Sequence, residues 1–281
     1  MQALDAIVGV VNKRFLQSLY KKRRGPKGYG LVRIIRLLVF AKAKNVFKTR
    51  TMRKYLKNHP DELRKLGFKK IPSRRSISDW KKSRAITLEK TVKLLGDRYA
   101  MLRSPKFTLL DSAPLPDSKD PEAKSGKTGR GWFKGFKVHH CCDDQRVPLR
   151  AKVTTGNVHD SKPAKELFVK SPVTLTDSAY DSKELREEAL NKDTILIADK
   201  NPRRGKKKEK RPVILKKLRY LIEQSNSIMK GPIMQNAWYE VKGLVQKTAF
   251  ALTSIILIQA IAIYTFIETG EVNLKVSEVL L

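Results

Sequence analysis

Three carboxylates, Asp111, Asp177 and Glu223, stand at positions from which they could hold divalent metal ions. Asp111 and Asp177 each end a short apolar run with strand character, and strand ends in open α/β sheets are where sites are built. Glu223 lies in a predicted helix, residues 216–230, in one of the most basic parts of the chain. Two strands and a helix can bring three oxygen donors to one place. A pair of Mg²⁺ ions held there would promote an in-line displacement at a phosphodiester.

Each acid also has a structural interpretation. Asp111 and Asp177 could be turn residues or helix caps, and Glu223 could pair with Arg219 four residues earlier for a few tenths of a kcal/mol. The three acids taken together, with cations placed around them, favour the metal site. On the helix a polar stripe runs beside an apolar seam. The stripe holds Lys216, Arg219, Glu223, Asn226 and Lys230, and the seam holds Leu218, Leu221, Ile222, Ser225 and Met229.

The charge of the chain predicts a polyanionic partner. The 281 residues carry 60 Lys and Arg against 27 Asp and Glu, a net charge of +33. Residues 1–110 hold +24 of this and residues 111–281 hold +9. Nucleic acid is the commonest partner for such a chain, and a membrane surface is the alternative. The adjacent Cys141 and Cys142 form no disulfide framework, which fits a reducing cytoplasm.

The first part of the chain has helical periodicity up to about residue 101, and Ser104-Pro105 ends it. We therefore predict a helical DNA-binding domain over residues 1–105. In its basic segment around residues 71–82, Ser73 or Ser76 is a candidate helix cap, and Ile77 and Trp80 are its apolar anchors. The residues predicted to contact DNA there are Arg74, Arg75, Lys81 and Lys82.

Residues 106–281 alternate between strand and helix patterns, which predicts an α/β domain with a mixed sheet flanked by helices. A hairpin is predicted from residues 136–142 and 147–154, and a flexible loop from residues 119–135. A helix capped by Asp160 and Ser161 is predicted over residues 160–169, and a basic loop over residues 200–211. The uncharged helix 249–267 is long enough to span a bilayer, but its polar residues favour a buried core helix. Trp132, Phe133 and Phe136 alternate with basic residues, so they are candidate DNA contacts, and at least one of them is expected in the core.

Several segments in order resemble the conserved blocks of the DDE transposases of prokaryotic insertion sequences. They are LLDSAP at 109–114, GFKVH at 135–139, TGNVHDS at 155–161 and TDSAYD at 176–181. The spacing of Arg219, Glu223 and Lys230 matches that family's Tyr-Arg-Glu-Lys signature. The resemblance covers about residues 30–265. The signature tyrosine, three residues before the arginine, falls on Lys216 in this chain.

The resemblance implies an RNase H-like catalytic domain with Asp111, Asp177 and Glu223 as its acidic triad and two Mg²⁺ or Mn²⁺ ions as cofactors. It implies that Arg219 and Lys230 contact the DNA backbone near the scissile phosphate. The full set of predicted DNA-binding residues is Arg219, Lys230, Asn226, Lys216, Lys137, Arg74, Arg75, Lys81 and Lys82. The expected partners are the inverted ends of the element and target DNA, with a homodimer on the DNA, no membrane, and a cytoplasmic location at a prokaryotic nucleoid.

Three alternatives to a transposase stay open. The chain could be an inactive DNA-binding relic or a repressor of its parent element, and Lys216 leaves room for this. It could be an RNase H-like nuclease without strand transfer. A membrane-anchored protein is the third alternative. His139 and His159 are natural candidates for a general base, because histidine titrates near neutral pH. Two-metal chemistry needs no general base, so we expect structural or DNA-contact roles for both.

Overall fold

The computed structural model describes residues 2–12, 16, 19, 29–129, 131–199, 213–234 and 237–274, with the side chains of 2, 213–219 and 237 left out. The chain divides into two compact units, Met1–Leu95 together with Pro232–Leu281, and Gly96–Gly231. This division differs from the predicted boundary at 105, and it places the C-terminal helix with the N-terminal ones. The predicted basic loop 200–211 lies outside the described residues.

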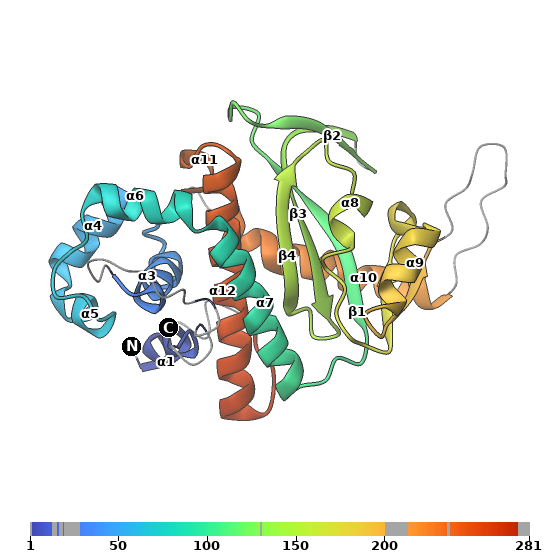
Figure 1. The fold of residues 1–281 in the computed structure, drawn as a ribbon, viewed down its shortest axis with the longest axis horizontal. Coiled ribbons are helices and arrows are strands. Elements are labelled where there is room, and N and C mark those ends of the chain that lie inside the picture. The colour runs from blue at the N-terminus through green and yellow to red at the C-terminus, as the bar shows by residue number, and fades with distance from the viewer. Residues whose placement is uncertain are drawn as a thin grey trace. The chain divides into compact units, whose positions relative to one another are not determined.

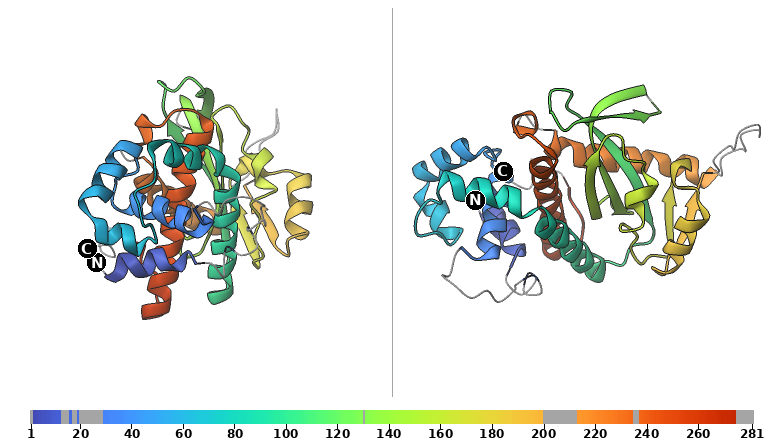
Figure 2. Two further views of the ribbon diagram at one scale, coloured as in Figure 1. Left: turned by 60° about the vertical axis from the view of Figure 1, so that its left-hand side comes forward. Right: turned by 45° about the horizontal axis from the view of Figure 1, so that its top comes forward.

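The first unit is helical. Its elements are α1 (Gln2–Val10), α3 (Leu31–Ala43), α4 (Thr49–Asn58), α5 (Pro60–Lys65), α6 (Arg74–Ser83), the first half of α7 (Ala85–Leu102), α11 (Ala237–Glu240) and α12 (Leu244–Thr269). Helix α12 packs against α1, α3 and α6 (Figures 1 and 2). The Ser73 hydroxyl accepts a hydrogen bond from the Ser76 amide and caps α6, as the sequence predicts.

Helix α12 is long and apolar enough to cross a membrane, yet 83% of its most apolar stretch is buried inside the structure. Polar side chains of this helix make hydrogen bonds within the unit, since Gln259 Nε2 donates to the Val92 carbonyl and Thr253 Oγ1 donates to the Ala249 carbonyl. A helix buried all round is what the core of a large unit contains. The burial agrees with the predicted core helix.

Three lysines are buried against aromatic rings in the first unit. The Nζ of Lys42 lies 3.4 Å from the ring centre of Phe250, and the Nζ atoms of Lys81 and Lys247 lie 4.2 Å from Phe47 and 4.0 Å from Trp238. Lys81 and Lys247 also donate to backbone carbonyls. The Lys42 ammonium has no hydrogen-bond partner among the described residues. Burial lowers the pKa of Lys42 to about 6.

This burial predicts a pH-dependent stability. From about pH 6 to 10.5 the folded state holds fewer protons at Lys42 than the unfolded state does, so the free energy of unfolding rises with pH. The slope is at most about 1.4 kcal/mol per pH unit. Lys42→Met should be more stable than wild type at neutral pH, with a difference that narrows as pH rises.

The measurement is denaturant unfolding followed by the fluorescence of the buried Trp80 and Trp238, which lie in the first unit. A range that stops near pH 7 limits the contribution of Lys81, whose pKa burial lowers to about 8, because Lys81 is still mostly protonated there. Lys54→Met, on the exposed side of α4, is the matched control and should keep the wild-type slope. A Lys42→Met protein with an unchanged slope contradicts the prediction.

The second unit is built on a six-stranded mixed sheet. Its strands are β1 (Thr108–Pro116), β2 (Lys124–Thr128), β3 (Gly131–Asp143), β4 (Pro148–Thr155), β5 (Val173–Thr176) and β6 (Ile195–Ala198). The order is β2-β3-β1-β5-β6, with β4 also paired to β3. Strand β3 is antiparallel to β1, β2 and β4, whereas β1, β5 and β6 are parallel to one another. The predicted hairpin is present as β3 and β4.

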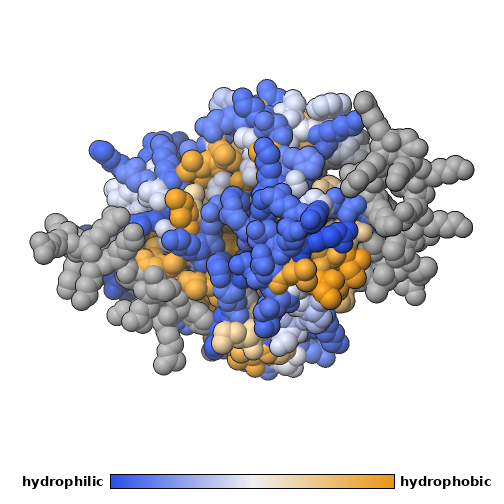
Figure 3. Space-filling model, turned by 45° about the vertical axis from the view of Figure 1, so that its right-hand side comes forward, coloured by the Kyte–Doolittle hydropathy of each residue, from blue (hydrophilic) through white to orange (hydrophobic). Residues whose placement is uncertain are grey.

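Helices cover the sheet on both sides (Figures 1 and 2). They are α8 (Ser161–Ala164), α9 (Lys183–Leu190) and α10 (Val213–Ile233), with the short 3₁₀ helix η2 (Ser178–Tyr180) after β5. Leu221 and Ile222 of α10 pack against Leu109 and Leu175 of the sheet. The predicted apolar seam of this helix therefore docks on the sheet as expected. The face of the molecule in Figure 3 is mostly hydrophilic, with separate apolar patches.

Two predicted segments differ from the structure. Residues 119–135 are not a loop throughout, because β2 and the start of β3 pair there as a ribbon. Polar and glycine-rich residues have low strand propensity, so the pairing rests on the backbone and not on an alternating pattern. The predicted helix 160–169 is only α8, and Asp160 makes no capping hydrogen bond. Its carboxylate binds Lys137 instead.

Candidate active site

The parallel pairing of β1 with β5 brings Asp111 and Asp177 next to each other. Leu110 is the register partner of Thr176, and each aspartate is the next residue along its strand. Hydrogen bonds between buried side chains hold this register, since Thr108 Oγ1 lies 2.7 Å from Thr174 Oγ1 and Thr176 Oγ1 donates to the Leu110 carbonyl at 2.8 Å. Asp177 directly follows β5 as predicted, but Asp111 is the fourth residue of β1, which continues to Pro116, so the prediction that it ends a strand is wrong. The two carboxylates still meet at one edge of the paired region, because the pairing of β1 with β5 ends at Leu110 and Thr176.

The surroundings of Asp111 favour its neutral form. Burial raises the pKa of Asp111 to about 7, and the charges of Asp177 and Asp160 add to the rise, while a hydrogen bond from Asn226 opposes it. Asp177 is exposed, and its Oδ1 accepts from the Ala179 amide at 2.9 Å, so it also caps the turn η2. The edge is thus a place of concentrated negative potential, which a cation would relieve.

Helix α10 reaches this edge through Asn226. Its Nδ2 donates to Asp111 Oδ2 at 2.7 Å, and its Oδ1 lies 2.8 Å from His140 Nε2. His140 is also the cross-strand partner of Asp111. Asn226 therefore ties the helix to both strands at the predicted catalytic aspartate.

The hydrogen bonds around Asn226 run in one direction. The ionised form of Asp111 only accepts, so the Asn226 amide group donates to it and the Asn226 carbonyl oxygen accepts from His140. Burial lowers the pKa of His140 to about 4, so the ring is neutral and carries its proton on Nε2. Its Nδ1 can then accept from the Cys142 thiol 3.1 Å away, since burial raises the pKa of Cys142 well above its usual range. The chain of donors Cys142, His140 and Asn226 fixes the position of the Asp111 carboxylate.

Glu223 and Lys230 share a side of α10 with Asn226. Glu223 lies one turn before Asn226 and Lys230 one turn after it, and residues three or four apart on a helix are neighbours. Glu223 is exposed. The charge of Lys230 is near enough to His140 to help lower the pKa of that ring. The predicted third carboxylate and one predicted DNA clamp therefore flank the point where α10 meets Asp111.

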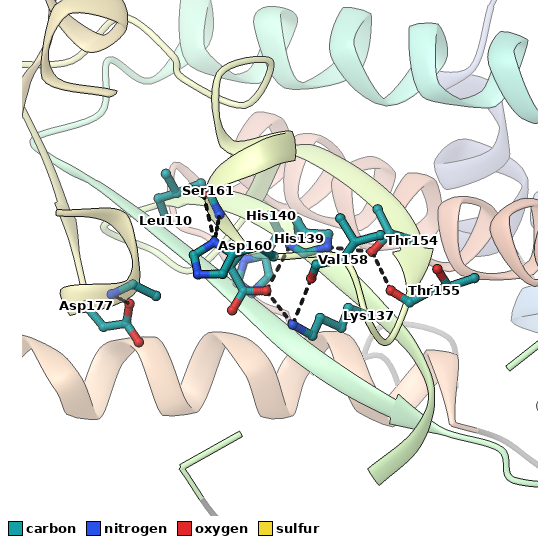
Figure 4. Close-up of polar contacts among 12 residues, drawn as sticks. Leu110, Lys137, His139, His140, Thr154, Thr155, Val158, Asp160, Ser161 and Asp177 are labelled. Carbon is teal, nitrogen blue, oxygen red and sulfur yellow. Dashed lines mark hydrogen bonds and ion pairs between the residues drawn. The ribbon is translucent and has the colours of Figure 1, made fainter. Parts of the chain in front are cut away.

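A second polar cluster lies on the other face of β3 (Figure 4). Lys137 Nζ contacts Asp160 Oδ1 at 2.8 Å and the Val158 carbonyl at 3.1 Å. His139 Nε2 lies 2.8 Å from Thr154 Oγ1, and its Nδ1 lies 3.7 Å from Asp160 Oδ1. Burial lowers the pKa of His139 to about 4, so the ring is neutral. Lys137 is buried in this cluster, which differs from its predicted place against DNA.

The predicted DNA-binding residues of α6 fall into two groups. Arg74, Arg75 and Lys82 are exposed. Lys81 is buried, donates to the Phe47 carbonyl and lies 3.2 Å from Thr49 Oγ1. The helical turn directs Lys81 into the core beside Trp80, so it does not face a phosphate in this structure. The side chains of Arg219 and Lys216 lie outside the described residues.

Two residues near the carboxylates escaped sequence reasoning. His140 carries no motif signal of its own, and only its register with Asp111 shows its place. Tyr180 is buried, and burial together with the charges of Asp111, Asp160 and Asp177 raises its pKa well above the usual range. The nearby Asp177 identified this segment as part of the site, but the sequence did not indicate that Tyr180 would be buried.

The carboxylates of Asp111, Asp177 and Glu223 are of the right chemical type to bind a divalent cation, and two of the three lie side by side. Carboxylate oxygens are the ligands that Mg²⁺ and Mn²⁺ prefer. Asp111 and Asp177 are adjacent, and Glu223 is one turn from the residue that bonds Asp111. Among the described residues, no three His, Cys, Asp or Glu side chains are gathered closely enough to hold an ion.

Two adjacent carboxylates on paired parallel strands, with a third on a covering helix, offer ligands for the metal ions used by enzymes that act on phosphodiesters. The family model described as "Transposase DDE domain" matches residues 102–257. This is more than half of the chain, so the chain belongs to the DDE transposase domain family.

The other comparisons are distant. No curated protein matches the sequence. A solved structure, the cryo-EM structure of the piggyBac transposase synaptic complex with hairpin DNA, is similar at 12% identity and a TM-score of 0.41. That match covers 100% of this chain and 76% of the other. At this distance it carries no argument about the fold or the reaction.

We predict that Asn226→Ala destabilises the second unit. The substitution leaves the buried side of Asp111 and the His140 ring without their shared partner, which costs about 1–3 kcal/mol of unfolding free energy. Denaturant unfolding measures the loss. Ser227→Ala, at an exposed position on the same helix, is the control and should be within about 0.5 kcal/mol of wild type. Equal stability of the two variants would show that Asn226 does not hold the site.

Proposed function

We propose that this protein is an active transposase that binds the inverted ends of its own element and carries out metal-dependent strand cleavage and strand transfer. Asp111, Asp177 and Glu223 are the catalytic and metal-binding residues in this proposal. The observation that supports it most is the β1–β5 register, which puts Asp111 beside Asp177, while Asn226, one turn from Glu223 on α10, bonds Asp111.

We also propose an RNase H-like catalytic domain within residues 106–281. The strand directions support it, since three antiparallel strands, β4, β3 and β1, are followed across the sheet by the parallel β5 and β6. Residues 1–105 would bind the element ends. A homodimer on DNA, and a location at the nucleoid of a prokaryotic cytoplasm, belong to the same proposal.

The chain's own residues prepare the site for chemistry. A bound pair of Mg²⁺ or Mn²⁺ ions would supply Lewis acidity for displacement at the phosphodiester. Asp111, Asp177 and Glu223 would hold those ions, and Asn226 would keep the Asp111 carboxylate in place. Lys230, Arg219 and Lys216 would bind the DNA backbone along α10. Water would first attack the phosphodiester at the end of the element, and the 3′-hydroxyl freed by this cut would then attack a phosphodiester of the target DNA. The proposal needs no general base from His139.

Removing one carboxylate should abolish cleavage. Asp177→Ala, Asp111→Asn and Glu223→Gln should each lower the rate by about 10²–10³-fold or more, the scale seen when one electrostatic contact to a transition state is lost. The measurement is Mg²⁺-dependent nicking of a duplex that carries the inverted repeat flanking the gene. Asp193→Asn, at an exposed surface ion pair with Lys170, is the matched control and should keep the wild-type rate.

A second arm uses the same duplex already cut to expose a 3′-hydroxyl, together with target DNA. Joined products support strand transfer. Nicking without joining would identify a nuclease instead. Equal nicking by wild type and Asp177→Ala would overturn the enzymatic proposal altogether.

The α6 surface should contribute phosphate contacts. Arg75→Ala and Lys82→Ala should each weaken binding to the inverted repeat and reduce the slope of log affinity against log salt by about one. Lys81→Met is the internal control, because the buried Lys81 does not face solvent and its removal should leave the slope unchanged. Fluorescence anisotropy over a salt series measures the slopes. An equal reduction in all three variants would argue against α6 as the contact surface.

A further inference from the structure

The ribbon formed by β2 and the first residues of β3 has two unlike faces. Gly126 pairs with Phe133, and these two residues face the turn at Gly156. A side chain on Gly126 would collide with the Gly156 carbonyl, so the backbones are in close contact there. This face of the ribbon is packed against the body of the second unit.

The other face carries a tryptophan among cations. Residues directly paired across antiparallel strands point to the same side. Trp132 pairs with Lys127, and Lys134 pairs with Ser125, so these four side chains share the outer face. Trp132 is 75% exposed, and the other three residues are exposed as well. An indole this exposed beside two ammonium groups has no packing role in the second unit.

The ribbon continues the strand that borders the candidate active site (Figure 1). Trp132, Lys134 and His140 lie at alternate positions of β3, and His140 is the cross-strand partner of Asp111. The eight residue steps from Trp132 to His140 span about 26 Å, or about eight base steps of DNA. A DNA backbone that passes Asp111 can therefore reach the ribbon along the same strand.

We propose that the outer face of the β2–β3 ribbon is a DNA-binding surface on which Trp132 stacks on an unpaired base while Lys127 and Lys134 bind the flanking phosphates. Aromatic rings interleaved with cations are the chemistry by which proteins hold single-stranded nucleic acid. The charge of the patch excludes a basic partner, and the flat indole matches a base face. The proposal takes DNA as its partner from the proposed function.

The chain offers a direct optical test. It contains three tryptophans, and Trp80 and Trp238 are only 8% and 0% exposed, so Trp132 is the one that a ligand in solution can touch. The full-length protein is titrated in EDTA with a 30-nucleotide oligo(dT) and, separately, with a blunt 30-base-pair duplex. Stacking should quench the tryptophan fluorescence with oligo(dT), and Trp132→Phe should lose that quenching.

Affinity gives the second readout. Trp132→Ala should weaken oligo(dT) binding by about 5- to 150-fold, whereas Trp132→Phe, which still stacks, should stay within about threefold of wild type. Binding of the blunt duplex should change much less, because its bases are paired. Tyr239→Ala, an exposed aromatic residue of the first unit, is the control and should bind as wild type does.

Three results would overturn the inference. The first is no change of tryptophan fluorescence with oligo(dT), and the second is an equal loss of affinity of Trp132→Ala for the single strand and the duplex. The third is a DNA-free Trp132→Ala protein whose mass in solution differs from that of wild type, which would mark the ribbon as a protein interface. If Trp132→Ala does not fold, the Trp132→Phe titration still decides the question. Because EDTA prevents cleavage, the test is separate from the catalytic one. A protein that stacks DNA on the ribbon but never cleaves would defeat only the proposed function.

Discussion

The site depends on the register between β1 and β5. Side chains alternate along a strand, so a slip of one residue would send Asp111 or Asp177 to the opposite face. Two buried contacts resist such a slip, the Thr108–Thr174 hydroxyl pair and the bond from Thr176 to the Leu110 carbonyl. The first joins side chains across the strands, and the second ties a side chain of one strand to the backbone of the other. The register of the two aspartates is thus set by hydrogen bonds between their neighbours, and the bonds from Asn226 and the Ala179 amide then orient the two carboxylates.

That placement has an electrostatic cost, and in the described part of the chain neutral donors orient the Asp111 carboxylate. The buried Lys137 of the sheet pairs with Asp160 on the other face of β3. Asp111 receives a neutral amide from Asn226, backed by a neutral histidine. A neutral donor orients the carboxylate but leaves most of its charge uncompensated, and its pKa stays raised to about 7. Such a carboxylate is oriented in advance and still attracts a cation.

The sequence predicted those features that follow from local pattern. The apolar run before Asp177 marked the end of β5, and the helical spacing of Leu221, Ile222 and Met229 marked the docked seam, now found packed or buried. The end predicted at Asp111 was wrong, because β1 continues to Pro116 in its pairing with β3. What it could not predict depends on contacts between distant residues. Strand β2 is polar and contains a glycine, so only its pairing with β3 defines it. Lys81 and Lys82 are alike in sequence, yet one helical position points into the core. Phe136 is buried while Trp132 is exposed, although both belong to one aromatic and basic stretch.

The C-terminal helix shows the largest effect of distant contacts. Helix α12 supplies the buried centre of a unit whose other helices come mostly from the first 95 residues. Its Gln259 side chain bonds the backbone of Val92, and Phe250 packs on Phe47 with ring centres 4.9 Å apart. The family match, residues 102–257, therefore runs through the sheet unit and into the core of the helical one. A fragment that stopped at residue 105 would lack α12, so the apolar faces of α1, α3 and α6 that pack against it would be open to water. The helical unit is thus complete only after the sheet has been synthesised, which makes the sheet an insertion within the helical fold.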